Sequence, residues 1–121
     1  ADEKAPESLS PAEERQVMER EGERLLARVQ PGEYTVALCV DGRRMDSPAF
    51  AAFLQSALEA RGQGVTFLVG GSLGLSSVVL ARADAKVSLS DMTLPHGLCR
   101  VFLLEQVYRA FKINAHEPYH K

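Results

Sequence analysis

Tyr34-Thr-Val-Ala-Leu-Cys-Val40 is the segment that decides the fold of this chain. It is apolar at nearly every position, which is typical of a strand covered on both faces inside a parallel sheet. Val65-Thr-Phe-Leu-Val69 has the same character, and residues 85–89 predict a weaker third strand. Asp41-Gly42, directly after the first strand, predicts a turn.

Helix signals stand before and between these strands. Ser10-Pro-Ala-Glu13 is a capping box with Pro at the first helical position, and it predicts a helix that stops before Pro31-Gly32. Gly22 falls on the apolar stripe of that helix, where it either allows a close approach or is a tolerated defect. Further helices are expected from Ser47-Pro48 to Gly62, from Ser76 or Ser77, and after Pro95.

Strands that alternate with helices predict an α/β fold, with a mainly parallel sheet and helices on both faces. Residues 1–121 are expected to form one domain. A sheet of three strands is thin and leaves two edges exposed. We therefore expect a partner subunit or a further piece of chain to cover them.

Composition narrows the class of protein only moderately. Apolar residues make up 45% and charged residues 25%, an ordinary balance for a soluble domain. No apolar run is long enough to span a bilayer, the first residues do not resemble a signal peptide, and the two cysteines lack CxxC spacing. These features predict a cytoplasmic protein without a membrane partner. The acidic first 24 residues and the mildly basic remainder do not by themselves identify a nucleic-acid binder.

Gly70-Gly-Ser-Leu-Gly74 follows a buried strand and precedes a helix. Ligands bind α/β sheets beyond the carboxyl ends of the strands, so this position favours a ligand-binding loop. The spacing matches neither GxGxxG nor a P-loop. A turn that needs glycine for its backbone geometry is the alternative.

The histidines do not predict a metal site. His116 and His120 are separated by Pro118, so they do not share a helical face, and no cysteine or acidic cluster lies near them in the sequence. A nucleophile elbow for Ser–His–acid catalysis is absent as well.

Charged residues interrupt the apolar last helix. Glu105 is expected either to pair with Arg109 one turn away or to act as a buried carboxylate that supports a site. Arg100 lies about two and a half turns from Arg109 and points away from it, whereas Lys112 lies near Arg109. The helix thus offers either two separate basic points or one basic point from each of two subunits.

Several blocks of sequence resemble a known family. They are Asp2-Glu-Lys-Ala-Pro-Glu7, Glu19-Arg-Glu-Gly-Glu-Arg24, Phe67-Leu-Val-Gly-Gly-Ser72, Ser88-Leu-Ser-Asp-Met-Thr-Leu-Pro-His96, Leu104-Glu-Gln-Val-Tyr-Arg-Ala-Phe111 and the tail Glu117-Pro-Tyr-His-Lys121. With these blocks, essentially the whole chain resembles the ribosomal large-subunit methyltransferase H family of the SPOUT superfamily.

The resemblance implies a homodimeric enzyme that uses S-adenosylmethionine to methylate N3 of a pseudouridine in the helix 69 loop of 23S ribosomal RNA. It also implies a C-terminal trefoil knot. Family members begin with a strand–helix–strand unit before the Asp2 block, so the chain is expected to be N-terminally truncated relative to them. By matching motif, the cofactor contacts are expected at Leu38, Gly70, Leu89, Ser90, Asp91, Met92, Thr93 and Leu94.

The tail supplies the candidate catalytic residues. His120 titrates in the range that suits a proton acceptor, and Tyr119 can donate a hydrogen bond. We expect both to reach toward the cofactor loop of a partner subunit, although a tail folded onto its own subunit is the alternative. The expected RNA-binding residues are His96, Arg100, Arg109 and Lys112. The other functions left open are a non-catalytic α/β nucleotide-binding module and an inactive fragment that still dimerises.

Overall fold

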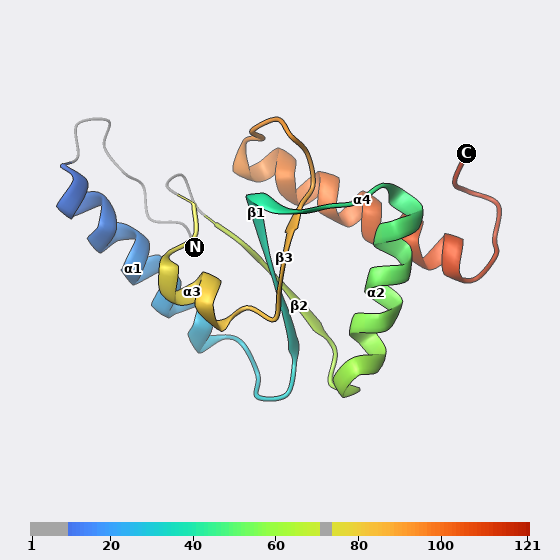
Figure 1. Cartoon of the computed structure of the whole chain (residues 1–121), viewed down its shortest axis with the longest axis horizontal. Coiled ribbons are helices and arrows are strands. Elements are labelled where there is room, and N and C mark those ends of the chain that lie inside the picture. Colours follow the sequence, from blue (N-terminus) through green and yellow to red (C-terminus); the bar gives the residue numbers. More distant parts are fainter. Residues whose placement is uncertain (1–9, 71–73) are drawn as a thin grey trace.

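The computed structural model describes residues 10–70 and 74–121. Helices and strands alternate along these residues (Figure 1). They are α1 (Pro11–Ala27), β1 (Tyr34–Arg44), α2 (Ser47–Arg61), β2 (Val65–Val69), α3 (Ser77–Arg82), β3 (Ala85–Ser88) and α4 (His96–Asn114). The predicted order of elements is confirmed, as are the helix starts at Ser10, Ser76 and Pro95 and the left-handed Gly62 that ends α2. Asp46 rather than Ser47 caps α2.

β1 is the central strand of a parallel sheet with the order β2-β1-β3. Leu38 lies opposite Val69 on one side and opposite Val87 on the other. The carboxyl ends of all three strands therefore meet at one edge of the sheet, which confirms the predicted parallel α/β arrangement.

Helices cover both faces of this sheet. α1 and α3 lie on one side, and α2 and α4 on the other (Figure 1). Val36 and Leu38 alternate with Thr35 and Ala37 along β1, and all four are buried. The larger core lies on the α2 and α4 side, where the strands pack against Phe50, Ala51, Leu54, Leu103 and Ala110. Each large apolar side chain buried there contributes roughly 1.5 to 3 kcal/mol.

The turn predicted at Asp41-Gly42 does not end the strand. β1 continues to Arg44, and both Leu38 and Arg43 lie opposite Val87, so the residues between them form an irregularity in the ladder. A Cβ atom on Gly42 would lie 2.7 Å from the backbone N and C atoms of Val87. Glycine is needed here because the backbone of β1 passes close to the backbone of β3.

Gly22 marks a close approach between α1 and α3, which decides between the two interpretations of this residue. A Cβ atom at this position would meet the side chain of Ser76 and lie 3.0 Å from Cγ2 of Val79. Ser10 accepts a hydrogen bond from the backbone N of Glu13 at 3.2 Å and completes the capping box. The small residue and the cap together set where α1 lies on the sheet.

α4 is apolar on two faces. Leu103 and Ala110 are buried against the core. A second stripe, at spacings of three and four residues, is more than half exposed and consists of Leu98, Val101, Leu104, Tyr108 and Phe111. We call it the α4 stripe. Among the residues that the structure describes, no helix is both long enough and apolar enough to cross a membrane.

Candidate active site

The strand register brings three of the expected cofactor contacts to one edge of the sheet. Gly70 directly follows Val69, and Leu89 follows β3, so both lie beside Leu38 at the carboxyl ends of the strands. A Cβ atom on Gly70 would lie 2.6 Å from the backbone C of Gly74. Gly70 is therefore glycine because the connection folds tightly back on itself, with the backbone of Gly74 in the place of a side chain. Residues 71–73 of the same loop lie outside the described part of the chain.

Hydrogen bonds between nearby residues stabilise the conformation of the connection at residues 89–94. Ser88 Oγ donates to the backbone oxygen of Ser90 at 2.9 Å, and Ser90 Oγ accepts from the backbone N of Met92 at 3.0 Å. Arg44 forms an exposed ion pair with Asp91. Met92 is 76% exposed and Leu94 is half-buried. Leu89 packs against the hydrophobic core, whereas the apolar side chain of Met92 faces solvent beside the polar groups of the loop.

A cavity of about 240 Å³ lies between β3, α4 and the connection from β1 to α2. Its wall includes Leu89, the first residue of the loop described above. The remaining lining is Met45, Asp46, Ser47, Phe50, Val87, Ser88, Phe102 and Gln106. The wall is mainly apolar, with Ser47 and Gln106 supplying a polar strip.

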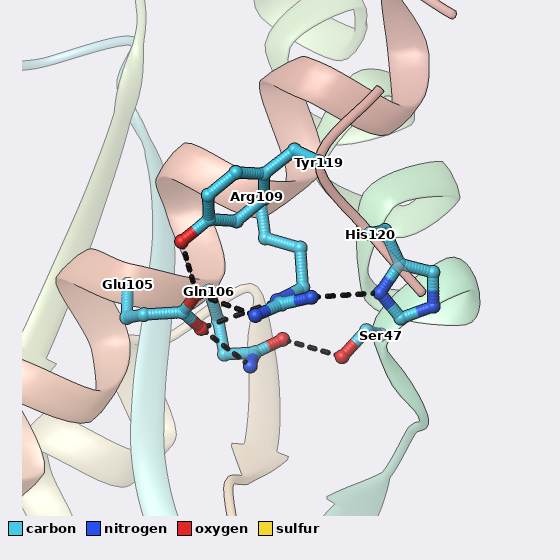
Figure 2. Close-up of polar contacts among 6 residues, drawn as sticks. All are labelled: Ser47, Glu105, Gln106, Arg109, Tyr119 and His120. Atoms are coloured by element: carbon cyan, nitrogen blue, oxygen red, sulfur yellow. Dashed lines mark hydrogen bonds and ion pairs between the residues drawn. The ribbon is translucent and has the colours of Figure 1, made fainter. Parts of the chain in front are cut away.

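Gln106 links this cavity to the C-terminal tail (Figure 2). Its Oε1 accepts a hydrogen bond from Ser47 Oγ at 2.7 Å, and its Nε2 donates to Oε1 of Glu105 at 2.9 Å. The oxygen and the nitrogen of the amide therefore each take part in a hydrogen bond. Sequence reasoning did not find this link, although a glutamine and a glutamate together in an apolar helix were a signal for it.

Glu105 is the centre of the polar cluster in Figure 2. It accepts hydrogen bonds from Arg109 Nη2 at 2.8 Å and Nε at 3.3 Å, and from the Tyr119 hydroxyl at 2.9 Å. The bonds from Arg109, followed by the bond from Tyr119, lower the pKa of Glu105 below its usual value. The same contacts with Glu105 raise the pKa of both Arg109 and Tyr119. These shifts favour an ionised Glu105, a charged Arg109 and a neutral Tyr119 at neutral pH.

The predicted ion pair of Glu105 and Arg109 is confirmed, and the same carboxylate also accepts a hydrogen bond from Tyr119 of the tail. The side chain of Glu105 is 36% exposed, however, and it is not a buried carboxylate.

The tail returns along α4 because the helix ends in a left-handed residue. His116 has a φ of 58°, and the backbone N of Glu117 donates to the backbone oxygen of Lys112 at 2.9 Å. Such a bond satisfies a carbonyl at the helix end and reverses the chain. Lys112 adds an ion pair with Glu117 at 3.1 Å.

Tyr119 then packs edge-on against Tyr108 of the α4 stripe, with ring centroids 5.0 Å apart. Arg109 lies over the ring of Tyr119, 4.8 Å from its centroid, and its Nη1 lies 3.0 Å from His120 Nδ1. Within one chain the tail therefore rests on its own α4, next to the exposed apolar surface.

The expected RNA-binding residues are spread along α4. Arg109 belongs to the cluster around Glu105, while Lys112 pairs with Glu117 and lies over the Tyr108 ring. Arg100 is exposed near the beginning of the helix. His96 is the first residue of α4, and the structure does not describe its side chain. Among described residues, no three His, Cys, Asp or Glu side chains are grouped so as to hold a metal ion.

The fold is a parallel α/β sheet whose strands end beside the candidate cofactor contacts, and the sequence comparison identifies the family to which such a chain belongs. The family described as "Predicted SPOUT methyltransferase" matches residues 2–120, and the chain belongs to this family.

Several similar proteins carry the name ribosomal RNA large subunit methyltransferase H. The one from Carboxydothermus hydrogenoformans is 54% identical over 121 residues, which is 99% of this chain and 76% of that protein. Those from Ligilactobacillus salivarius and Listeria monocytogenes are 52% and 51% identical over 120 residues, with the same coverage.

Proposed function

We propose that this protein transfers a methyl group from S-adenosylmethionine to N3 of a pseudouridine in the helix 69 loop of 23S ribosomal RNA. Membership of a methyltransferase family and the names of the relatives support the reaction class and the RNA substrate. The structural observation that carries the proposal is the register that sets Leu38 between Val69 and Val87. It places three separate connections where one ligand can touch all of them.

The residues at this edge fit the proposed cofactor. Gly70 lacks a side chain because its loop folds back against the backbone of Gly74, and this tight connection shapes the edge of the proposed cofactor site. Met92 and Leu94 would add apolar contacts around the cofactor, while Leu38, whose side chain is buried in the core, would support the site from beneath. The cofactor supplies an electrophilic methyl group on a positively charged sulfur, and the protein aligns the reactants and excludes water.

We extend the proposal to a homodimer with a trefoil knot at its C-terminus. The α4 stripe supports the dimer, because a monomer would leave five large apolar side chains on one helix face in water. A second copy placed on this stripe would also bring its tail and the cofactor loops of the first copy closer together. Arg100, Arg109, Lys112 and His96 would then supply the contacts to RNA phosphates, and an RNA of the ribosome implies a cytoplasmic protein.

The test is a calorimetric titration with S-adenosylmethionine, followed by methylation of purified large ribosomal subunits with labelled cofactor. We expect saturable binding and the transfer of label to one nucleotide of 23S RNA. Binding without transfer to any ribosomal substrate would instead favour a non-catalytic nucleotide-binding module. The absence of binding in a folded, dimeric protein would favour an inactive fragment.

A further inference from the structure

The contact between Arg109 and His120 determines which nitrogen of the imidazole carries its hydrogen. Nη1 of Arg109 lies 3.0 Å from Nδ1 of His120. A guanidinium group has only donors, so Nδ1 must accept this hydrogen bond. An imidazole that accepts at Nδ1 is neutral and carries its hydrogen at Nε2.

Other contacts fix the position of the Arg109 side chain. Two of its nitrogens donate to the carboxylate of Glu105, and its guanidinium lies over the ring of Tyr119. Nη1 is the part of the group that remains directed at His120 (Figure 2). The contact with Glu105 raises the pKa of Arg109, so this residue remains a donor throughout the neutral range.

We propose that Arg109 is a positioning residue that fixes His120 as an Nε2–H donor, so that the tail offers its substrate a hydrogen-bond donor and not a base. The inference rests on the proposed methyl transfer and deepens it. Glu105 takes part through Arg109, whose orientation it sets.

The chemistry of an imide substrate suits a donor. N3 releases its proton to solvent water before the site closes over the substrate, and the negative charge spreads onto the two flanking carbonyl oxygens. The Nε2–H group of His120 donates to one of these oxygens and stabilises the anion. The N3 electron pair then forms the bond to the methyl carbon, while the carbon–sulfur bond breaks and its electrons remain on the sulfur, which becomes a neutral thioether.

Tyr119 cannot donate the same hydrogen bond to the substrate, because its hydroxyl group already donates to Glu105. It donates its single hydroxyl hydrogen to Glu105 at 2.9 Å, and this bond raises the pKa of the phenol. The function of Tyr119 is then to hold the tail against α4, and His120 is the residue that presents a polar hydrogen outward.

Nitrogen-15 NMR of the imidazole side chains tests the tautomer without any assay of activity. The chain has three histidines, so the variants His96→Asn and His116→Asn assign the His120 signals. We expect the wild-type protein to show an unprotonated Nδ1 and a protonated Nε2. In Arg109→Met we expect a mixture of tautomers, and in the control Lys112→Met, which removes another paired cation of α4, no change. A hydrogen on Nδ1 in the wild type, or an unchanged spectrum in folded Arg109→Met, would overturn the proposal.

A second experiment compares two substitutions of His120 in the assay of methylation on ribosomal subunits. His120→Asn retains a side-chain N–H donor, whereas His120→Asp retains only acceptors. We expect the asparagine variant to keep at least about ten times the kcat of the aspartate variant, with similar KM values. Equal or greater activity of His120→Asp would refute the donor role. Failure of the proposed function is distinguishable, because it would abolish transfer by the wild type and leave the NMR result standing.

Discussion

The carboxylate of Asp84 accepts a hydrogen bond from the backbone N of Thr35 at 2.8 Å, across 49 residues of chain. The same carboxylate forms an ion pair with Arg61 at 2.6 Å. Asp84 directly precedes β3, Thr35 lies at the beginning of β1, and Arg61 ends α2. One side chain therefore ties together three elements at the edge of the sheet opposite the candidate active site.

Replacing Asp84 by alanine should reduce the free energy of unfolding by about 1 to 3 kcal/mol, because it leaves the buried N–H group of Thr35 without its acceptor. Chemical denaturation of the variant and of the wild type measures the loss. Glu14→Ala, at an exposed position of α1, is the matched control and should change stability little. Equal stability of Asp84→Ala and wild type would contradict the role of this carboxylate.

The contribution of Asp84 should depend on pH. Burial raises the pKa of this carboxyl, but the hydrogen bond from Thr35 and the charge of Arg61 outweigh burial, and its pKa is lowered. A lowered pKa in the folded state means that the stabilisation is complete above about pH 4, the value of an unfolded aspartate, and disappears as pH falls toward the folded pKa. Denaturation of the wild type and of Asp84→Asn should therefore give curves that converge in acid. A difference that grows as pH falls would show that the sign is wrong.

Adding a methyl group to Gly70 should weaken cofactor binding. The new Cβ would lie 2.6 Å from the backbone of Gly74, so the connection would have to open and would shift the groups around the ligand. We expect a Kd for S-adenosylmethionine at least about tenfold higher in Gly70→Ala, and no measurable binding in Gly70→Leu. Gly97→Ala is the control, because a Cβ at Gly97 would meet nothing within 4 Å. Unchanged affinity in a folded Gly70→Leu variant would refute this assignment.

A charge in the middle of the α4 stripe should prevent dimerisation. Leu104 is 68% exposed in the single chain, and a lysine there would be unpaired and desolvated in an interface. Sedimentation velocity should show a dimer for the wild type and a folded monomer for Leu104→Lys. Val78→Lys changes an apolar residue on α3 that is 57% exposed and should leave the dimer intact. A dimer that survives Leu104→Lys would place the interface elsewhere.

Mixed dimers should show whether each active site uses two subunits. Gly70→Leu and His120→Ala should each be inactive alone. In a mixed dimer one site would combine the intact loop of one subunit with the intact tail of the other, so random mixing should restore about a quarter of the wild-type sites. No recovery of activity, with mixed dimers confirmed by mass spectrometry, would mean that each tail serves its own subunit. That result would agree with the intrachain contact between Tyr119 and Glu105.

Local signals in the sequence were sufficient for most of the fold. Capping residues act within one helical turn, so Ser10 and Ser76 correctly marked the starts of two helices. The apolar run at Tyr34 indicated a strand covered on both faces of a parallel sheet, and this strand is β1. Its central place in the order β2-β1-β3 was not predicted, because several strands of such a sheet have the same apolar character. The turn predicted at Asp41-Gly42 was wrong, because Gly42 allows a close approach to the backbone of Val87, which lies far away in the sequence. Turn propensity cannot distinguish a reversal from a close crossing of two strands.

The candidate site was predictable only in part. The register of Leu38 follows from parallel pairing, so its meeting with Gly70 and Leu89 could be expected from the topology. The bond from Tyr119 to Glu105 spans fourteen residues and depends on the left-handed turn at His116. That turn occurs at a histidine, a residue type that gives little signal for positive φ. Similarly, Ser47 and Gln106 meet only because α2 and α4 pack side by side.

The central position of β1 has a consequence for the synthesis of this protein. Both neighbours of β1 are made after it, and Ala85, which lies opposite Val36, is added 49 residues later. At about 5 to 20 residues per second, β1 leaves the ribosome several seconds before its last partner exists. Both edges of this apolar strand lack a partner until β2 is made, and one edge still lacks its partner until β3 is made, which is the condition for wrong pairing with another chain. The strand that is most enclosed in the finished molecule is thus the one most at risk of aggregation in the nascent chain.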